Sequence, residues 1–85
     1  MNVNITPNWK LIDNLKIERE FVFKNFTSAL KFVNKVGKLA EKEKHHPDIL
    51  IHNYNKVKLT LSTHSAGKVT DKDFELAEKI NEIFK

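Results

Sequence analysis

All four histidines of this chain lie within 20 consecutive positions, from His45 to His64. Two of them, His45 and His46, are adjacent, and His64 closes the stretch. Imidazole is the side chain whose ordinary titration falls closest to neutral pH, so it can both give and take a proton there. A well-placed group of this kind accelerates a reaction by about 10²–10⁴-fold. Three imidazoles around one cleft therefore suit general acid–base chemistry.

The neighbours of the histidines indicate how a cleft could form. Glu41 lies four positions before His45, so the two share a helical face on which the carboxylate can hold one imidazole tautomer. His46 leaves that helix as it ends, and His64 arrives at the end of a strand. If the helix end and the strand end meet, three imidazoles surround one cleft with Glu41 behind them.

Other interpretations of the same residues are weaker. Taken singly, a histidine is more often a surface or hydrogen-bonded side chain, and His52, in mid-strand with no paired feature, is assigned to that class. A metal site would use His45, His46, His64 and Glu41. Adjacent histidines rarely converge on one ion from a helix end, and the His-x-x-x-His spacing is missing. We therefore expect no metal, and no serine nucleophile triad is evident.

The polarity pattern predicts the elements that position these side chains. Residues 15–24 alternate with the period of a half-buried strand, with Arg19 as the one charged side chain on the apolar face. Residues 9–12 are a short run of mixed polarity and are expected to form an edge strand. From residue 27, apolar side chains recur at steps of three and four, which predicts an amphipathic helix ending near residue 44, before Pro47.

The second half of the chain repeats this arrangement. The polarity pattern predicts two strands, residues 49–54 and 57–63, that form a hairpin about Asn55-Lys56. Thr70-x-x-Asp73 has the form of an acidic capping box and begins a second amphipathic helix. The order predicts one α+β domain over residues 1–85, with two layers. A four-stranded antiparallel sheet forms one layer, and both helices pack on one of its faces.

Composition narrows the function classes. The 85 residues carry a formal net charge of +4 and no cysteine, which excludes a disulfide framework and a thiol nucleophile. Of the 15 basic residues all but Arg19 are lysines, and they are spread over different elements, which argues against nucleic-acid binding. The first ten residues lack the apolar run of a signal peptide, and no segment is apolar enough to span a bilayer. We expect a cytoplasmic protein, or a nuclear one in a eukaryote, with no membrane partner.

Five anchors follow one another through the second half of the chain: Glu41, His45-His46-Pro47, Tyr54, His64 and Asp73. In types and spacing this series resembles the motif of the pterin-4a-carbinolamine dehydratases, also known as dimerisation cofactors of a homeodomain transcription factor. The phrases YNKVKLTLSTH and DFELAEKI are also similar to that family. The resemblance covers roughly residues 9–84.

The resemblance implies a reaction. Family members remove water from 4a-hydroxytetrahydropterin to give the quinonoid dihydropterin, which recycles a hydroxylase cofactor, and they use no metal or bound cofactor. It implies that His45, His46 and His64 are catalytic, with His46 as base and the other two as acid or positioning groups. Glu41 and Asp73 are supporting residues, Glu41 orienting His45 and Asp73 capping its helix. The pterin pocket is expected to include residues beside the histidines, partly through backbone groups: Pro47, Thr63, Ser65 and Ala66.

The resemblance also implies self-association. Family members assemble through sheet edges, and a small domain with an exposed edge strand has reason to do so. We therefore expect a homodimer or homotetramer. The alternative function is a non-catalytic binding module that stabilises a partner protein's dimer, as animal relatives do through a helix surface. Lysines dominate the outer face of the first predicted helix, which argues against an apolar partner surface there: Lys31, Lys35, Lys38 and Lys42.

Overall fold

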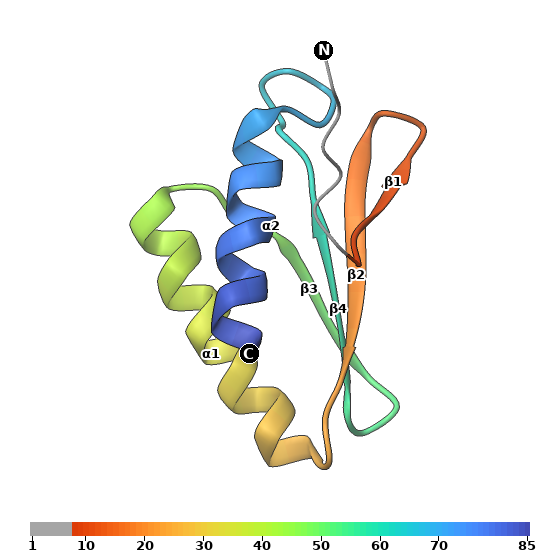
Figure 1. Cartoon of the computed structure of the whole chain (residues 1–85), viewed down its shortest axis with the longest axis vertical. Coiled ribbons are helices and arrows are strands. Elements are labelled where there is room, and N and C mark those ends of the chain that lie inside the picture. Colours follow the sequence, from red (N-terminus) through yellow and green to blue (C-terminus); the bar gives the residue numbers. More distant parts are fainter. Residues whose placement is uncertain (1–7) are drawn as a thin grey trace.

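A computed structural model describes residues 8–85 of the chain (Figure 1). Its elements follow in this order: β1 (Lys10–Ile12), β2 (Lys16–Val22), α1 (Phe26–Glu43), β3 (Asp48–His52), β4 (Lys56–Leu61) and α2 (Asp71–Phe84). Within the described residues, no helix is long and apolar enough to cross a membrane.

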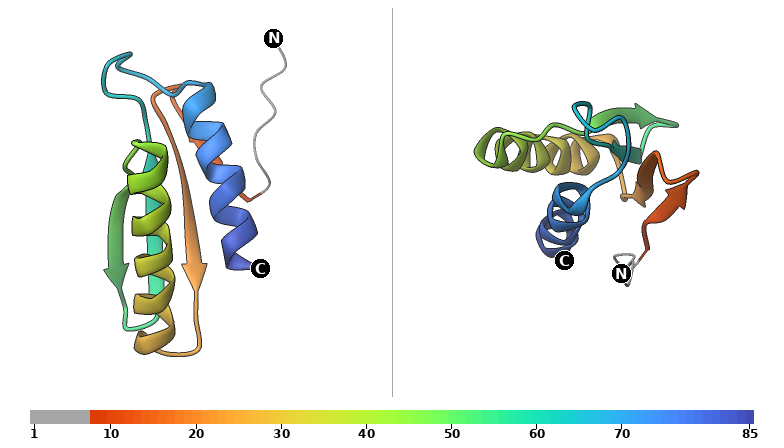
Figure 2. Two further views of the ribbon diagram at one scale, coloured as in Figure 1. Left: turned by 90° about the vertical axis from the view of Figure 1, so that its left-hand side faces the viewer. Right: turned by 90° about the horizontal axis from the view of Figure 1, so that it is seen from above.

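The strands form one antiparallel sheet in the order β1-β2-β4-β3. The whole of β4 pairs with β2, from Leu61 opposite Ile17 to Lys56 opposite Val22. Both helices cover the same face of the sheet, and the other face is left open (Figure 2). The predicted two-layer α+β fold with this order of elements is therefore confirmed.

The core lies between the sheet and the helices, because each element turns one apolar row inward. Ile17 and Phe21 of β2 are almost fully buried, as are the alternate residues of β4. The rings of Phe21 and Phe32 lie 4.7 Å apart between centroids. The buried residues that the helices contribute are Ala29, Phe32, Val36 and Ala40 from α1 and Leu76, Ala77 and Ile80 from α2.

Arg19, the charged exception on the apolar face of β2, lies at the margin of this core. Its guanidinium carbon is 4.2 Å from the ring centroid of Phe21 and 5.0 Å from that of Phe84. Its Nη1 donates to Oδ1 of Asn81 over 2.6 Å, and Nε1 of Trp9 donates to the same oxygen over 2.9 Å. The charge is thus stacked on aromatic faces and hydrogen-bonded, which offsets the cost of its partial burial.

The turn between β3 and β4 differs from the prediction. The sequence predicts a turn about Asn55-Lys56, whereas the turn occupies residues 53–55 and β4 already begins at Lys56. Asn53 and Tyr54 both have positive φ, 49° and 72°. Asparagine adopts the left-handed conformation more readily than other residues with a side chain. A turn that starts at Asn53 therefore replaces the one predicted two residues later.

Replacing Tyr54 by glycine is expected to stabilise the fold. The side chain is 64% exposed, so little packing is lost, while its positive φ of 72° is unfavourable for any residue with a Cβ. We expect a gain of about 0.5–1 kcal/mol, which raises the melting temperature by roughly 2–8 °C in a domain of this size. Thermal unfolding followed by circular dichroism measures this. The control Tyr54→Phe keeps both the ring and the strain and should melt like the wild type; a glycine variant that melts lower would contradict the prediction.

Candidate active site

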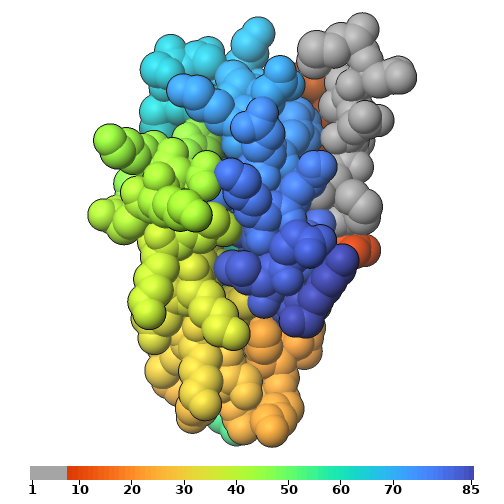
Figure 3. All heavy atoms as spheres, turned by 60° about the vertical axis from the view of Figure 1, so that its left-hand side comes forward, coloured from red at the N-terminus to blue at the C-terminus, as the bar shows by residue number. Residues whose placement is uncertain are grey.

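The predicted histidine cleft lies at the end of the molecule where α1 ends and the chain passes from β4 to α2 (Figure 3). Lys44 ends α1 in the left-handed conformation, with φ 55°, and its backbone N–H donates to the oxygen of Ala40. This turn and Pro47 direct the chain out of the helix and into β3. The hollow has a volume of about 410 Å³. Six of the residues predicted for the site line it: His45, His46, Pro47, Thr63, His64 and Ser65.

His45 is paired with a buried carboxylate. Its Nε2 lies 2.5 Å from Oδ1 of Asp73, whose side chain has no exposed surface, while the His45 side chain is 15% exposed. The second oxygen of Asp73, Oδ2, accepts from Oγ1 of Thr63 and from the backbone N–H of Thr70, both over 2.9 Å. A buried carboxylate needs such partners, because a charge without them is strongly destabilising in the interior.

The partner predicted for His45 was therefore wrong. The four-residue spacing from Glu41 implies contact only while the helix continues, and α1 ends at Glu43, before His45. Asp73 takes that place from 28 residues away. Its predicted capping role is confirmed, because Asp73 and Thr70 form a capping box at the start of α2. One side chain thus both caps the helix and holds a histidine.

His46 is the histidine that Glu41 contacts. Its Nε2 lies 2.5 Å from Oε2 of Glu41, and both side chains are open to solvent, at 60% and 78% exposed. Water screens such a pair, so the contact contributes little to stability. The two histidine–carboxylate pairs consequently differ in burial: the pair of His45 is largely enclosed by protein, and the pair of His46 is open to solvent.

The other two histidines differ in position. His64 lines the hollow and is exposed, and the structure gives its ring no hydrogen-bond partner among residues 8–85. His52 lies elsewhere, as expected: its Nε2 is 2.7 Å from Oε1 of Glu20 on the open face of the sheet. Three of the four histidines, and not the fourth, therefore meet in one hollow.

Some predicted binding residues are placed differently. Ala66 is exposed in the turn after β4 and does not line the hollow. Thr63 lines it, but is buried and directs its hydroxyl to Asp73. The sequence reasoning missed four further lining residues, two of which adjoin the His-His-Pro segment: Lys44, Asp48, Ser62 and Lys72. Their closeness to predicted site residues in the chain was the signal available for finding them.

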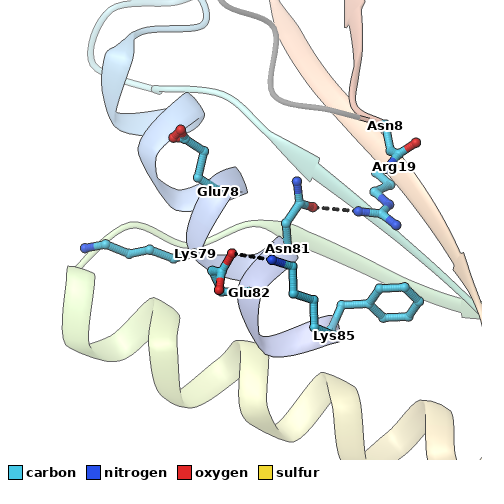
Figure 4. A pocket seen from close by; sticks show the side chains of 8 residues that line it. Asn8, Arg19, Glu78, Lys79, Asn81, Glu82 and Lys85 are labelled. Carbon is cyan, nitrogen blue, oxygen red and sulfur yellow. Dashed lines mark hydrogen bonds and ion pairs between the residues drawn. The ribbon is translucent and has the colours of Figure 1, made fainter.

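A larger hollow, of about 560 Å³, lies at the far end of α2 (Figure 4). Most of its charged groups are already bonded: Nη1 of Arg19 donates to Asn81, Nζ of Lys85 lies 3.0 Å from Oε2 of Glu82, and Lys79 pairs with Glu43 outside the hollow. No histidine or other group that titrates near neutral pH lines it. The smaller hollow, with its three imidazoles, is therefore the better candidate for chemistry.

An ion pair ties the two helices together beside the histidine site. Nζ of Lys79 on α2 lies 2.9 Å from Oε2 of Glu43 on α1. The hydrogen bond from Lys79 lowers the pKa of Glu43 from its ordinary value. The stabilisation from this pair is therefore present above the unfolded-state pKa and is lost as the pH falls through the folded-state value.

In residues 8–85, no group of three or more side chains has the arrangement of a metal site.

Comparison with known proteins places the chain in a family. The family model described as pterin 4 alpha carbinolamine dehydratase matches residues 2–83. A protein of Sulfolobus acidocaldarius, provisionally named a pterin-4-alpha-carbinolamine dehydratase, is 52% identical over 71 residues, which are 84% of this chain and 77% of that protein. A protein of a Picosynechococcus species with the same provisional name is 52% identical over 77 residues, which are 91% of this chain and 82% of that protein.

Solved structures agree. The crystal structure of a transcriptional coactivator/pterin dehydratase from Brucella melitensis has a TM-score of 0.83 at 40% identity, covering 91% of this chain and 82% of the other. A pterin dehydratase-like protein identified as a RuBisCO assembly factor in the alpha-carboxysome has a TM-score of 0.75 at 17% identity, a likeness that extends to the fold alone. On these matches, the chain belongs to the pterin 4 alpha carbinolamine dehydratase family.

Proposed function

We propose that this protein dehydrates 4a-hydroxytetrahydropterin to the quinonoid dihydropterin by histidine acid–base catalysis. The observation that carries the proposal is the meeting of His45, His46 and His64 in one hollow. Its volume of about 410 Å³ lies within the range of small-molecule sites, roughly 300–1,000 Å³. Membership of the family supplies the pterin as substrate class.

The reaction needs one proton delivered and one removed. The bond between C4a and the hydroxyl oxygen breaks as that oxygen takes a proton and leaves as water. A ring nitrogen loses its proton, and its electron pair forms the new C=N bond. No oxidant or reductant takes part, and two positioned imidazoles are sufficient for both transfers.

We assign roles by environment. His46 is the base, because its exposed pair with Glu41 lets it pass the proton on to water. His45, held by buried Asp73, and His64 act as the acid or position the pterin. Pro47 and Ser65, which line the hollow, contribute backbone groups around the ring. Glu41 thus orients His46, and not His45.

An assay of the reaction tests the proposal. A hydroxylase generates the 4a-carbinolamine continuously, and the ultraviolet spectrum follows its conversion with catalytic amounts of this protein present or absent. We expect clear acceleration over the spontaneous reaction. A folded wild type, checked by circular dichroism, that leaves the spontaneous rate unchanged would contradict the proposal. The non-catalytic binding module is not favoured: the name of the Brucella structure joins a coactivator with a pterin dehydratase, and the likeness to the assembly factor extends to the fold alone.

We also propose that the chain forms homodimers through β3. This strand is an outer strand of the sheet, and its Ile49 and Leu50 are 39% and 52% exposed. Beside it, Val33 and Gly37 of α1 line a groove together with Ile49. An exposed apolar edge strand is a template for pairing with a second strand. Dimerisation through it would extend the sheet and cover these side chains.

The double variant Ile49→Lys, Leu50→Lys is expected to be monomeric. Two charges on the paired edge would have to be buried against the partner copy, which is unfavourable. Light scattering coupled to size exclusion should give about twice the 9.9 kDa chain mass for the wild type and a single mass for the variant. Val22→Lys is the matched control, because Val22 is an exposed apolar residue of the inner strand β2, and it should remain dimeric. A monomeric wild type would overturn this prediction.

A further inference from the structure

The buried carboxylate of Asp73 is the centre of a hydrogen-bond chain that runs from the start of α2 to His45. Oγ1 of Thr70 lies 2.7 Å from Oγ1 of Thr63. Thr63 Oγ1 lies 2.9 Å from Asp73 Oδ2, and Asp73 Oδ1 lies 2.5 Å from His45 Nε2. Thr63 and Asp73 are both buried, and no buried side-chain polar atom among the described residues lacks a partner.

The donor in each of these hydrogen bonds follows from which groups carry a proton. A carboxylate only accepts, so the single hydroxyl proton of Thr63 goes to Asp73 Oδ2. Thr63 must then accept from Thr70, whose hydroxyl is the donor of that pair. Oδ2 also accepts from the backbone N–H of Thr70. At Oδ1, His45 Nε2 must carry a proton in order to bond to the carboxylate.

We propose that Thr63 and Thr70 are positioning residues that act through Asp73 to hold His45 as the Nε2–H tautomer, so that Nδ1 is the only nitrogen of His45 that gains or loses a proton. In both protonation states of the ring, the Nε2 proton stays on the Asp73 bond. The tautomer follows from the contacts alone. Its catalytic consequence, proton exchange with the pterin through Nδ1, rests on the proposed function.

His46 lacks such a device. Its partner Glu41 is exposed, and among residues 8–85 His46 is the only side chain that is hydrogen-bonded to that carboxylate. The orientation of the His46 ring is therefore set by a carboxylate that can move. A carboxylate therefore fixes the orientation of the His45 ring, whereas the carboxylate beside His46 leaves that ring free to reorient.

Histidine side-chain ¹⁵N NMR tests the tautomer without substrate. Spectra are recorded at a pH about two units above the ordinary histidine value of ~6.5, with His45→Gln to assign the signals. We expect the wild type to show a protonated Nε2 and an unprotonated Nδ1 at His45. Thr63→Val removes one of the two donors that hold Oδ2 of Asp73, so the carboxylate can turn away from His45 and the two tautomers are expected to mix. Thr63→Ser, which restores the hydroxyl, is expected to return the wild-type signals.

Asp73→Asn gives the sharpest outcome. The hydroxyl of Thr63 and the backbone N–H of Thr70 both donate to the atom at the Oδ2 position. The amide oxygen of the asparagine must therefore lie there, and its NH₂ must face His45 Nε2. His45 should then switch to the Nδ1–H tautomer. Backbone ¹H–¹⁵N spectra check that the variant is folded. A wild type with Nδ1–H, or an Asp73→Asn protein that keeps Nε2–H, would overturn the inference.

Kinetics separate this inference from the proposed function. With a pterin carbinolamine as substrate, Thr63→Val is expected to lower kcat about tenfold with little change in KM, in line with the loss of other groups that orient a histidine. Thr63→Ser should restore kcat. If the NMR outcomes hold but no dehydration is seen, the positioning chain stands and the proposed function fails. If wild type dehydrates but Thr63→Val keeps the wild-type tautomer and kcat, the positioning role is wrong.

Discussion

Replacing Asp73 by alanine is expected to remove about 3–5 kcal/mol of folding free energy, the cost typical of breaking a buried pair from one side. The side chain is fully buried and bonded to His45, Thr63 and the backbone of Thr70. Each buried donor left without an acceptor costs about 1–3 kcal/mol. Loss of the capping box at α2 adds about 1 kcal/mol. Urea unfolding measures the loss, and dehydration activity should fall with it.

Glu41→Ala is the matched control for this prediction. It also removes a carboxylate that lies 2.5 Å from a histidine nitrogen, but this pair is exposed on the surface. Exposed pairs contribute about 0–1 kcal/mol, so this variant should unfold almost like the wild type. Asp73→Asn should lose less than Asp73→Ala, since it keeps the volume and the acceptor for Thr63 and Thr70. Equal losses in the two alanine variants would contradict the account of Asp73 as the buried centre of the site.

His46→Ala and His64→Ala are each expected to lower the dehydration rate by about 10²–10⁴-fold while leaving the fold intact. Both residues line the hollow and both are exposed, so truncation removes a proton-transfer group without opening the core. The coupled ultraviolet assay measures kcat, and urea unfolding should show a change of no more than about 0.5 kcal/mol.

The chain supplies its own control for the histidines. His52→Ala removes a histidine that is also paired with a carboxylate, Glu20, but lies on the open face of the sheet, away from the hollow. Its rate should remain within about twofold of the wild type. If His46→Ala and His64→Ala retained full activity, or if His52→Ala lost as much as they do, acid–base chemistry in this hollow would have to be abandoned.

The fold could be predicted from the sequence because the local spacing of apolar residues indicates each strand and helix. The alternation along β2 and β4 and the three- and four-residue steps of α1 give the buried faces directly. The turn at Asn53 was misplaced, because Asn53 and Asn55 are both favourable turn residues and local propensity does not rank them. Tyr54, in the left-handed conformation, is unfavourable locally and is held there by the pairing of the strands on either side.

The members of the site were largely predictable, and their partners were not. The three histidines and their neighbours were found from residue type and spacing, together with a family resemblance that the comparisons confirmed. The bond from His45 to Asp73 joins residues 28 apart in the chain, across two strands and a loop, and no local pattern encodes it. Lys44 ends α1 with left-handed backbone angles. The path that the chain takes from there determines which carboxylate each histidine contacts.

A single-turnover stopped-flow experiment tests the central claim most directly. The 4a-carbinolamine is generated rapidly, mixed with an excess of this protein, and its ultraviolet decay is followed at increasing protein concentration. The account predicts a rate that rises above the spontaneous decay, saturates as the hollow fills, and returns nearly to the spontaneous value in His46→Ala. Decay at the spontaneous rate at every concentration of folded wild type would contradict it.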